Sequence, residues 1–116
     1  MRALQIRRVY AEPGPNEGRR VLVDRVWPRG LSKQDLAGVV WMKEVGPSDA
    51  LRKWFAHRPE RWDGFRERYF AELDHNPAVA QLRALMREGQ VTLLFGAKDE
   101  THNQAVALRD YLSRES

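Results

Sequence analysis

The sequence contains no cysteine in its 116 residues. This absence excludes disulfide bonds, thiolate metal sites and cysteine nucleophiles. No apolar run approaches the roughly 20 residues that a membrane-spanning helix needs, so we expect no membrane partner. The first ten residues, MRALQIRRVY, have no apolar core ahead of their charges as a signal peptide would, and we therefore expect a cytoplasmic protein.

Lysine is also scarce, since the chain has four lysines beside sixteen arginines. The formal net charge of +4 makes anionic partners plausible. The basic residues are spread along the chain, however, and do not form the clustered stripe expected of a nucleic-acid-binding protein. With 42% hydrophobic and 31% charged residues the composition is that of a globular protein, and the length predicts one domain over residues 1–116.

Hydrophobic patterning predicts three strands. Residues 3–10 alternate apolar and polar side chains, residues 20–26 contain a continuous apolar run typical of a strand buried on both faces, and residues 90–97 form the clearest strand. The first two strands are joined by EPGPNEG, residues 12–18, which has the composition of a turn. A connection this short predicts a hairpin, because a parallel crossover usually takes about a dozen residues or more.

Apolar residues at helical spacing predict four helices, in residues 48–55, 59–73, 79–88 and 101–112. Ser48 is the expected N-cap of the first, and Thr101 with Gln104 fits a capping box at the start of the last.

Residues 36–45 allow two interpretations, a helical turn capped by Ser32 or a short strand at Val39–Met42. The order of strands and helices along the chain predicts an α/β domain with a small, mainly parallel sheet flanked by helices.

Charged side chains follow two of the apolar strands at the point where each ends. DRVWPRG, residues 24–30, leaves the second strand and AKDETHN, residues 97–103, leaves the strand at 90–97. Ligands of open α/β sheets bind outside the carboxyl ends of the strands, so parallel neighbours would bring both segments to one crevice. The residues expected there are Asp24, Arg25, Trp27, Arg29, Lys98, Asp99, His102 and Asn103.

Each residue type has a chemical role available at such a crevice. Arg25 and Arg29 can hold a phosphate or carboxylate through paired N–H donors. His102 can move a proton near neutral pH, and Asp24 or Asp99 can orient its imidazole or act as a base. None of these roles requires a metal or a cofactor.

The same residues also have purely structural interpretations. Asp24 and Arg25 can belong to an ion-pair network, Asp99 can cap a helix, and Lys98 can be a solvated charge. For Trp27 we favour packing over stacking on a ligand.

Structural roles are favoured for several other conspicuous residues. His57 and His75 lie at predicted helix ends, and Glu72, Asp74 and His75 lack a partner at metal-ligand spacing. We expect a helical stripe to form core and a group of arginines to form a solvated face. The stripe is Trp54, Phe55, Trp62, Phe65 and Tyr69, and the arginines are Arg58, Arg61, Arg66 and Arg68.

Three segments identify a resemblance that covers almost the whole chain. VLVDRVWPRGLSK, WMKEVGPSDALRKWFAHRPERWDGFRERYFAEL and VTLLFGAKDETHNQAVALRDYL are similar to the YeaO-like family of bacterial proteins, a domain of unknown function. The resemblance implies an α/β fold and no particular activity.

The chain also resembles longer relatives in which a strand, a helix and a strand precede an Asp-Arg-Pro segment. On that comparison Asp24, Pro28 and His102 keep shared positions, and the first two strands are parallel despite their short link. Thr101 stands where the longer relatives often carry a cysteine, so no thiol role is carried over.

These observations lead to an expected function with two alternatives. We expect binding of an anionic, phosphorylated or nucleotide-like small molecule, with acid–base chemistry by His102 and an aspartate as a further possibility. The alternatives are a non-catalytic anion- or nucleotide-binding module and, with weaker support, a nucleic-acid-binding protein. The sequence leaves the oligomeric state open.

Overall fold

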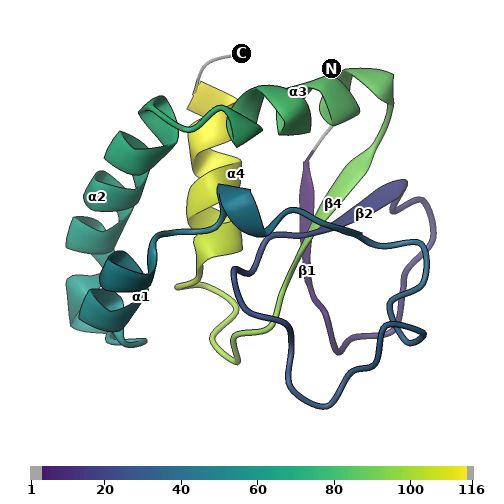
Figure 1. Cartoon of the computed structure of the whole chain (residues 1–116), viewed down its shortest axis with the longest axis horizontal. Coiled ribbons are helices and arrows are strands. Elements are labelled where there is room, and N and C mark those ends of the chain that lie inside the picture. Colours follow the sequence, from purple (N-terminus) through teal and green to yellow (C-terminus); the bar gives the residue numbers. More distant parts are fainter. Residues whose placement is uncertain (1–3, 115–116) are drawn as a thin grey trace.

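The computed structural model describes residues 4–114 and has an α/β fold, as predicted (Figure 1). Ala3, the first residue of the predicted N-terminal strand, lies outside the described residues. A four-stranded parallel sheet has the order β1-β4-β2-β3. The strands are β1 (Gln5–Arg8), β2 (Arg19–Leu22), β3 (Val40–Trp41) and β4 (Val91–Phe95). The helices are α1 (Asp49–Phe55), α2 (Trp62–Asp74), α3 (Ala78–Glu88) and α4 (Gln104–Arg114), with short 3₁₀ turns η1 (Lys43–Val45) and η2 (Pro59–Arg61).

The order of the strands shows that the predicted hairpin between β1 and β2 is wrong. Both strands pair with β4, which lies between them, and both run parallel to it. The parallel arrangement implied by the resemblance is therefore confirmed. The physical reason is that β4 is buried at all five positions and is apolar at all of them except Thr92, so it occupies the centre of the sheet.

The helices begin largely where the sequence predicts, with one exception. Ser48 caps α1, since its Oγ accepts a hydrogen bond from the Leu51 N–H at 3.1 Å. The capping box at Thr101 is wrong. Asn103 caps α4 instead, because its Oδ1 accepts from the Val106 N–H at 3.0 Å. Thr101 contacts Asp99 in the preceding turn.

The structure shows a short strand within residues 36–45, the second of the two interpretations. Val40–Trp41 forms β3, which pairs with β2 at the edge of the sheet. Ser32 caps no helix: it exchanges two hydrogen bonds with Asp35, at 2.9 and 3.1 Å, in an exposed turn.

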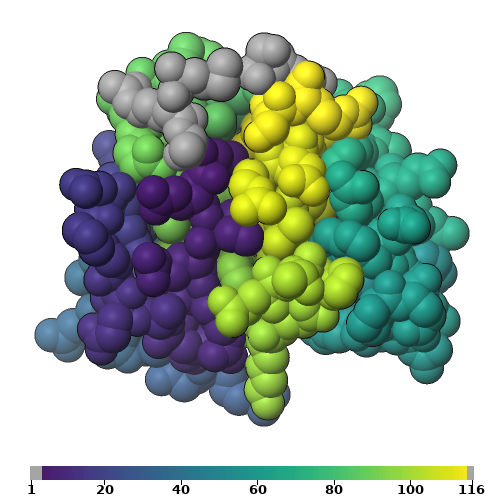
Figure 2. All heavy atoms as spheres, turned by 180° about the vertical axis from the view of Figure 1, so that it is seen from behind, coloured from purple at the N-terminus to yellow at the C-terminus, as the bar shows by residue number. Residues whose placement is uncertain are grey.

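The helices cover one face of the sheet. Figure 2 shows α4 lying between β1 on one side and α2 on the other. Side chains that alternate along β2 and β4 point into this layer, and they pack with Phe55, Phe65 and Tyr69 from the predicted aromatic stripe. The sheet side chains concerned are Val21, Val23, Val91, Leu93 and Phe95.

The opposite face of the sheet is covered by a segment without a helix. Leu22 and Leu94 point to this side and pack with Leu36 and Val9. Trp27, Leu31 and Val39 add partly buried apolar surface to the same cluster. The apolar run Val21–Val23 is therefore buried on both faces of the sheet, as predicted, and residues 24–39 cover the face without a helix.

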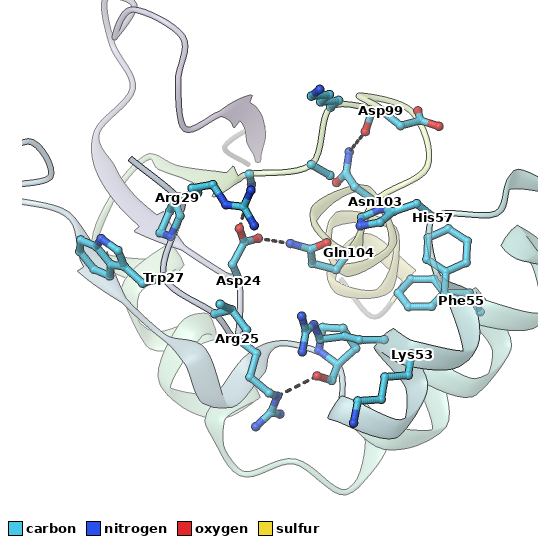
Figure 3. A pocket seen from close by; sticks show the side chains of 18 of the residues that line it. Asp24, Arg25, Trp27, Arg29, Lys53, Phe55, His57, Asp99, Asn103 and Gln104 are labelled. Atoms are coloured by element: carbon cyan, nitrogen blue, oxygen red, sulfur yellow. Dashed lines mark hydrogen bonds between the residues drawn. The ribbon is translucent and has the colours of Figure 1, made fainter. Parts of the chain in front are cut away.

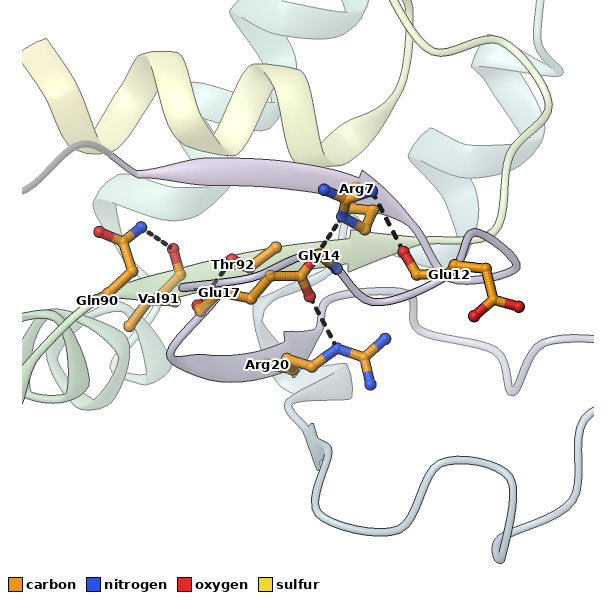
Figure 4. A network of polar contacts seen from close by, with 8 residues as sticks. All are labelled: Arg7, Glu12, Gly14, Glu17, Arg20, Gln90, Val91 and Thr92. Atoms are coloured by element: carbon orange, nitrogen blue, oxygen red, sulfur yellow. Dashed lines mark hydrogen bonds and ion pairs between the residues drawn. The ribbon is translucent and has the colours of Figure 1, made fainter.

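The link between β1 and β2 is held by a buried carboxylate, Glu17, which is only 4% exposed (Figure 4). Its side chain pairs with Arg7 from β1 and with Arg20 from β2, the latter at 3.1 Å, and accepts the Gly14 N–H at 2.8 Å. Its carbonyl oxygen accepts from the hydroxyl of Thr92 in β4. These contacts tie the link to β1, β2 and β4 and take the place of a crossover helix.

No helix within residues 4–114 is long and apolar enough to cross a membrane.

Candidate functional site

The segments that follow β2 and β4 lie side by side and border an open cavity of about 850 Å³ (Figure 3). The two strands are hydrogen-bonded parallel neighbours, so their carboxyl ends meet at one edge. The third wall comes from α1 and the turn after it. This is the crevice position that the sequence predicts. The residues that line it are Tyr10, Asp24, Arg25, Val26, Trp27, Pro28, Arg29, Pro47, Arg52, Lys53, Phe55, His57, Phe65, Gly96, Ala97, Lys98, Asp99, Asn103 and Gln104.

Asp24 joins the two segments at this edge of the sheet. One carboxylate oxygen accepts the Gly96 N–H at 2.9 Å, and the other accepts from the Gln104 side chain. A Cβ at position 96 would lie 2.8 Å from the Asp24 oxygen, so glycine is needed for this approach. Burial raises the pKa of Asp24 from 3.8 to about 6, although the Gly96 N–H and the charge of Arg52 act in the opposite direction.

Arg25 holds the backbone that leads into α1. Its Nε donates to the Pro47 carbonyl at 2.7 Å and its Nη2 to the Gly46 carbonyl at 2.8 Å. The neighbouring Val45 carbonyl accepts from the buried hydroxyl of Tyr69 at 2.6 Å. Arg25 therefore contributes positive charge to the cavity, while two of its nitrogens donate hydrogen bonds that hold the backbone before α1.

Trp27 lines the cavity but is mainly a packing residue. Its indole N–H donates to the Leu31 carbonyl at 2.6 Å, and its ring meets that of Trp41 edge-on with centroids 5.1 Å apart. In Figure 3 the ring points away from the centre of the cavity. This geometry agrees with the packing interpretation that the sequence favours.

Three cations around the cavity carry no internal partner. The side chains of Arg29, Lys53 and Lys98 are exposed and make no hydrogen bond or ion pair within residues 4–114. They come from three elements: the loop after β2, α1 and the loop after β4. With Arg25 and Arg52 they make five cationic side chains against two carboxylates, Asp24 and Asp99, so the cavity has an excess of positive charge.

His102 and Asp99 form a pair of their own beside the cavity. Asp99 accepts from the backbone N–H groups of Thr101 and His102, and its Oδ2 lies 3.0 Å from the His102 Nδ1. The pKa of Asp99 lies below its usual range mainly because its carboxylate accepts a hydrogen bond from the Thr101 backbone N–H, although burial acts in the opposite direction. The His102 ring packs edge-on against Trp62 at 5.3 Å, and His102 is not among the described residues that line the cavity.

Asn103 lines the cavity with a side chain whose nitrogen and oxygen both have hydrogen-bond partners. Its Nδ2 donates to the Asp99 carbonyl at 2.9 Å, and its Oδ1 caps α4. It is 2% exposed. Asn103 therefore shapes the wall of the cavity through its contacts with the loop and the helix.

Several lining residues were missed by the sequence reasoning, among them Lys53, His57 and Gln104. Gln104 matched a capping box, which hid its contact with Asp24. Lys53 lies on α1 and His57 in the turn that follows it. The sequence identified this helix only by its apolar face, and periodicity does not say where the polar face points. For Lys53 the signal in the sequence was its positive charge.

The described residues contain no group of three histidine, aspartate or glutamate side chains placed to hold a metal ion.

The fold and the cavity define a small α/β protein with a positively charged crevice at the carboxyl edge of a parallel sheet. A family model described as DUF488-N3i, the inactive DUF488-N3 subclade, matches residues 3–116. The chain belongs to this family, and the resemblance to YeaO-like proteins is confirmed.

Relatives of similar length are found in distant bacteria. The chain is 43% identical over 110 residues to uncharacterized protein YeaO of Escherichia coli. The matched region covers 94% of this chain and 96% of the relative. It is 40% identical over 110 residues to uncharacterized protein Rv3073c of Mycobacterium tuberculosis. That match covers 95% of this chain and 93% of the relative. No solved structure matches the chain.

Proposed function

We propose that this protein binds an anionic small molecule, phosphorylated or nucleotide-like, in the cavity at the carboxyl ends of the strands, and that it does so without catalysis. The observation that carries the proposal is the convergence on one cavity of Arg29, Lys53 and Lys98, whose side chains make no hydrogen bond or ion pair within residues 4–114. Unpaired cations from three elements repel one another, and an anion between them removes that repulsion.

The size and lining of the cavity favour a ligand with an apolar part. About 850 Å³ is within the range of small-molecule sites and far exceeds a single phosphate group. Tyr10 and Val26 line it and are 42% and 54% exposed, among the most exposed large apolar side chains of the described residues. A ligand with a planar group beside its acidic group, such as a nucleotide, would cover this surface.

Two observations support binding without turnover. His102, the expected proton carrier, lies outside the cavity lining and is committed to Asp99. The family is described as an inactive subclade. A protein that recognises its ligand and passes the signal on through a partner needs neither a nucleophile nor a proton carrier at the site.

The test compares matched lysine variants. Nucleoside monophosphates, sugar phosphates and inorganic phosphate are screened by thermal shift, since binding to the folded state raises the melting temperature. For the best ligand we expect Lys98→Ala to weaken binding by about tenfold through the loss of one charge-assisted contact. Lys33→Ala is the control, because Lys33 is an exposed lysine outside the cavity lining. Equal affinity of both variants, or no binding by the native protein, would overturn the proposal.

Acid–base chemistry remains the second candidate because of one observation, the buried Asp24 with a pKa of about 6 in the cavity. Incubation with the bound compound followed by mass spectrometry distinguishes the two. A product whose formation is lost in Asp24→Asn would favour chemistry, and an unchanged compound favours the binding module.

The nucleic-acid alternative has weaker support. Arg66 pairs with Asp110 at 3.2 Å, and the guanidinium groups of Arg61 and Arg68 stack on Trp54. These arginines therefore already have partners. Affinity for single or double strands that falls steeply with rising salt would revive this alternative.

A further inference from the structure

The turn after α1 contains two consecutive residues in the left-handed backbone region, and neither is glycine. Ala56 has φ 47° and ψ 35°, and His57 has φ 56°. Glycine and asparagine are the residues that usually adopt this conformation, since a Cβ crowds the backbone there. Two such residues in succession cost stability, and strain of this kind persists where the surrounding structure imposes it.

Backbone hydrogen bonds hold this strained turn in place. The Ala56 N–H donates to the Arg52 carbonyl at 2.9 Å, which ends α1. The Arg58 N–H donates to the Phe55 carbonyl, also at 2.9 Å, and the chain then enters η2 at Pro59. The turn therefore has a defined geometry and places His57 beside the ring of Phe55, with centroids 6.3 Å apart.

The imidazole of His57 has no polar partner of its own. It is exposed and lines the cavity, and it makes no hydrogen bond or ion pair with the rest of the described chain. His102 differs in this respect, since its Nδ1 is held by Asp99. Both ring nitrogens of His57 are thus available to a molecule in the cavity, on the same wall as Lys53 (Figure 3).

We propose that His57 is a ligand-binding residue that donates a hydrogen bond to an acidic oxygen of the bound molecule, and that the strained turn is kept because it aims the ring into the cavity. The inference rests on the proposed function and adds to it a residue in the turn after α1 that contacts the ligand. A histidine that only covered Phe55 would gain nothing from the left-handed conformation, because Phe65 already stacks on Phe55 and Trp62 packs against it at a tilt.

The inference predicts that stability and binding respond differently at two adjacent positions. Ala56→Gly relieves strain and leaves the ring in place, so we expect the melting temperature to rise by about 2–4 °C with unchanged affinity. His57→Gly relieves the same kind of strain and removes the ring, so we expect affinity to fall about tenfold without a loss of stability that would explain it.

His57→Asn keeps a side chain that tolerates the left-handed region and can donate a hydrogen bond. We expect it to bind within about threefold of the native protein. His75→Asn makes the same change at an exposed histidine outside the cavity lining and serves as the control, with unchanged affinity expected.

Affinities are measured by isothermal titration calorimetry with adenosine monophosphate and with inorganic phosphate, and stabilities by thermal unfolding. Native affinity in His57→Gly, while Lys98→Ala is weakened, would overturn this inference and leave the proposed function standing. Absence of binding by the native protein to either probe would overturn both. An equal loss of affinity in Ala56→Gly and His57→Gly would also overturn it, because the turn rather than the ring would then be responsible.

Discussion

The carboxyl group of Asp24 joins two walls of the cavity through hydrogen bonds to the segment that follows β4. It receives the Gly96 N–H and the Gln104 side chain, and it is partly buried beside an excess of positive charge. Burial dominates and raises its pKa to about 6. An acid of this kind is more easily kept protonated in the folded protein than in the unfolded chain.

The consequence for stability can be tested with Asp24→Asn. The folded-state pKa of Asp24 lies above the ordinary value of 3.8, so its favourable contribution is complete below about pH 4 and is lost as the pH rises through about 6. Asparagine does not ionise, and it can keep both hydrogen bonds if the Gln104 amide turns over. We expect the stability of Asp24→Asn relative to the native protein to increase between pH 4 and pH 7, by at most about 3 kcal/mol.

Urea unfolding of both proteins at pH 4, 5, 6 and 7.5 measures this difference. A difference that is independent of pH would mean that the two N–H donors and the nearby cations outweigh the burial of the carboxylate. A relative loss of stability in Asp24→Asn at higher pH would point the same way.

At the residue scale the sequence predicted position better than role. Asp24, Arg29 and Lys98 meet at one cavity because they follow neighbouring parallel strands, and the order of the elements was enough to expect this. The roles of His57 and His102 were not predictable. The direction of each ring depends on local turns, namely the left-handed pair at 56–57 and the turn stabilised by Asp99.

At the scale of the elements, the ten-residue link between β1 and β2 differs most from the usual connection between parallel strands. A parallel crossover usually contains a helix, whereas this link relies on the buried side chain of Glu17. Apolar patterning cannot reveal such an anchor, since a glutamate among turn residues is normally interpreted as a charge exposed to solvent. The hairpin prediction failed for this reason.

Glu17→Ala tests the anchor. The change leaves the Gly14 N–H and the guanidinium groups of Arg7 and Arg20 without their shared carboxylate, so we expect a loss of stability of about 2–4 kcal/mol. Glu12→Ala is the control, because Glu12 is an exposed acid in the same link, and we expect an effect within about 0.5 kcal/mol. Denaturant unfolding measures both, and equal effects would show that Glu17 is not the anchor.

On the scale of the whole molecule, the two faces of the sheet have unequal covers. Helices pack on one face, and residues 24–39, which contain turns and no helix, pack on the other. The continuous apolar run in residues 20–26 indicated that both faces of the sheet are covered. The sequence could not show that one cover lacks a helix, because loop packing has no periodicity.

Hydrogen exchange should distinguish the two faces. We expect the amides of Leu93 and Leu94, in the central strand, to be at least about 100-fold more protected than those of Ala37 and Val39, whose hydrogen bonds close turns of the exposed cover. Exchange measured by NMR at neutral pH checks this. Equal protection would mean that the cover opens only when the whole molecule unfolds.

The central place of β4 has a consequence for biosynthesis. Within the described sheet β1 pairs with β4 alone, and β2 has besides β4 only the two-residue β3. On the ribosome, the N-terminal strands therefore emerge long before the strand that unites them has been translated. Pairings between distant parts of a chain form slowly, so the apolar residues of these strands, such as Ile6 and Val21, stay without their partner strand and open to aggregation until β4 has been released.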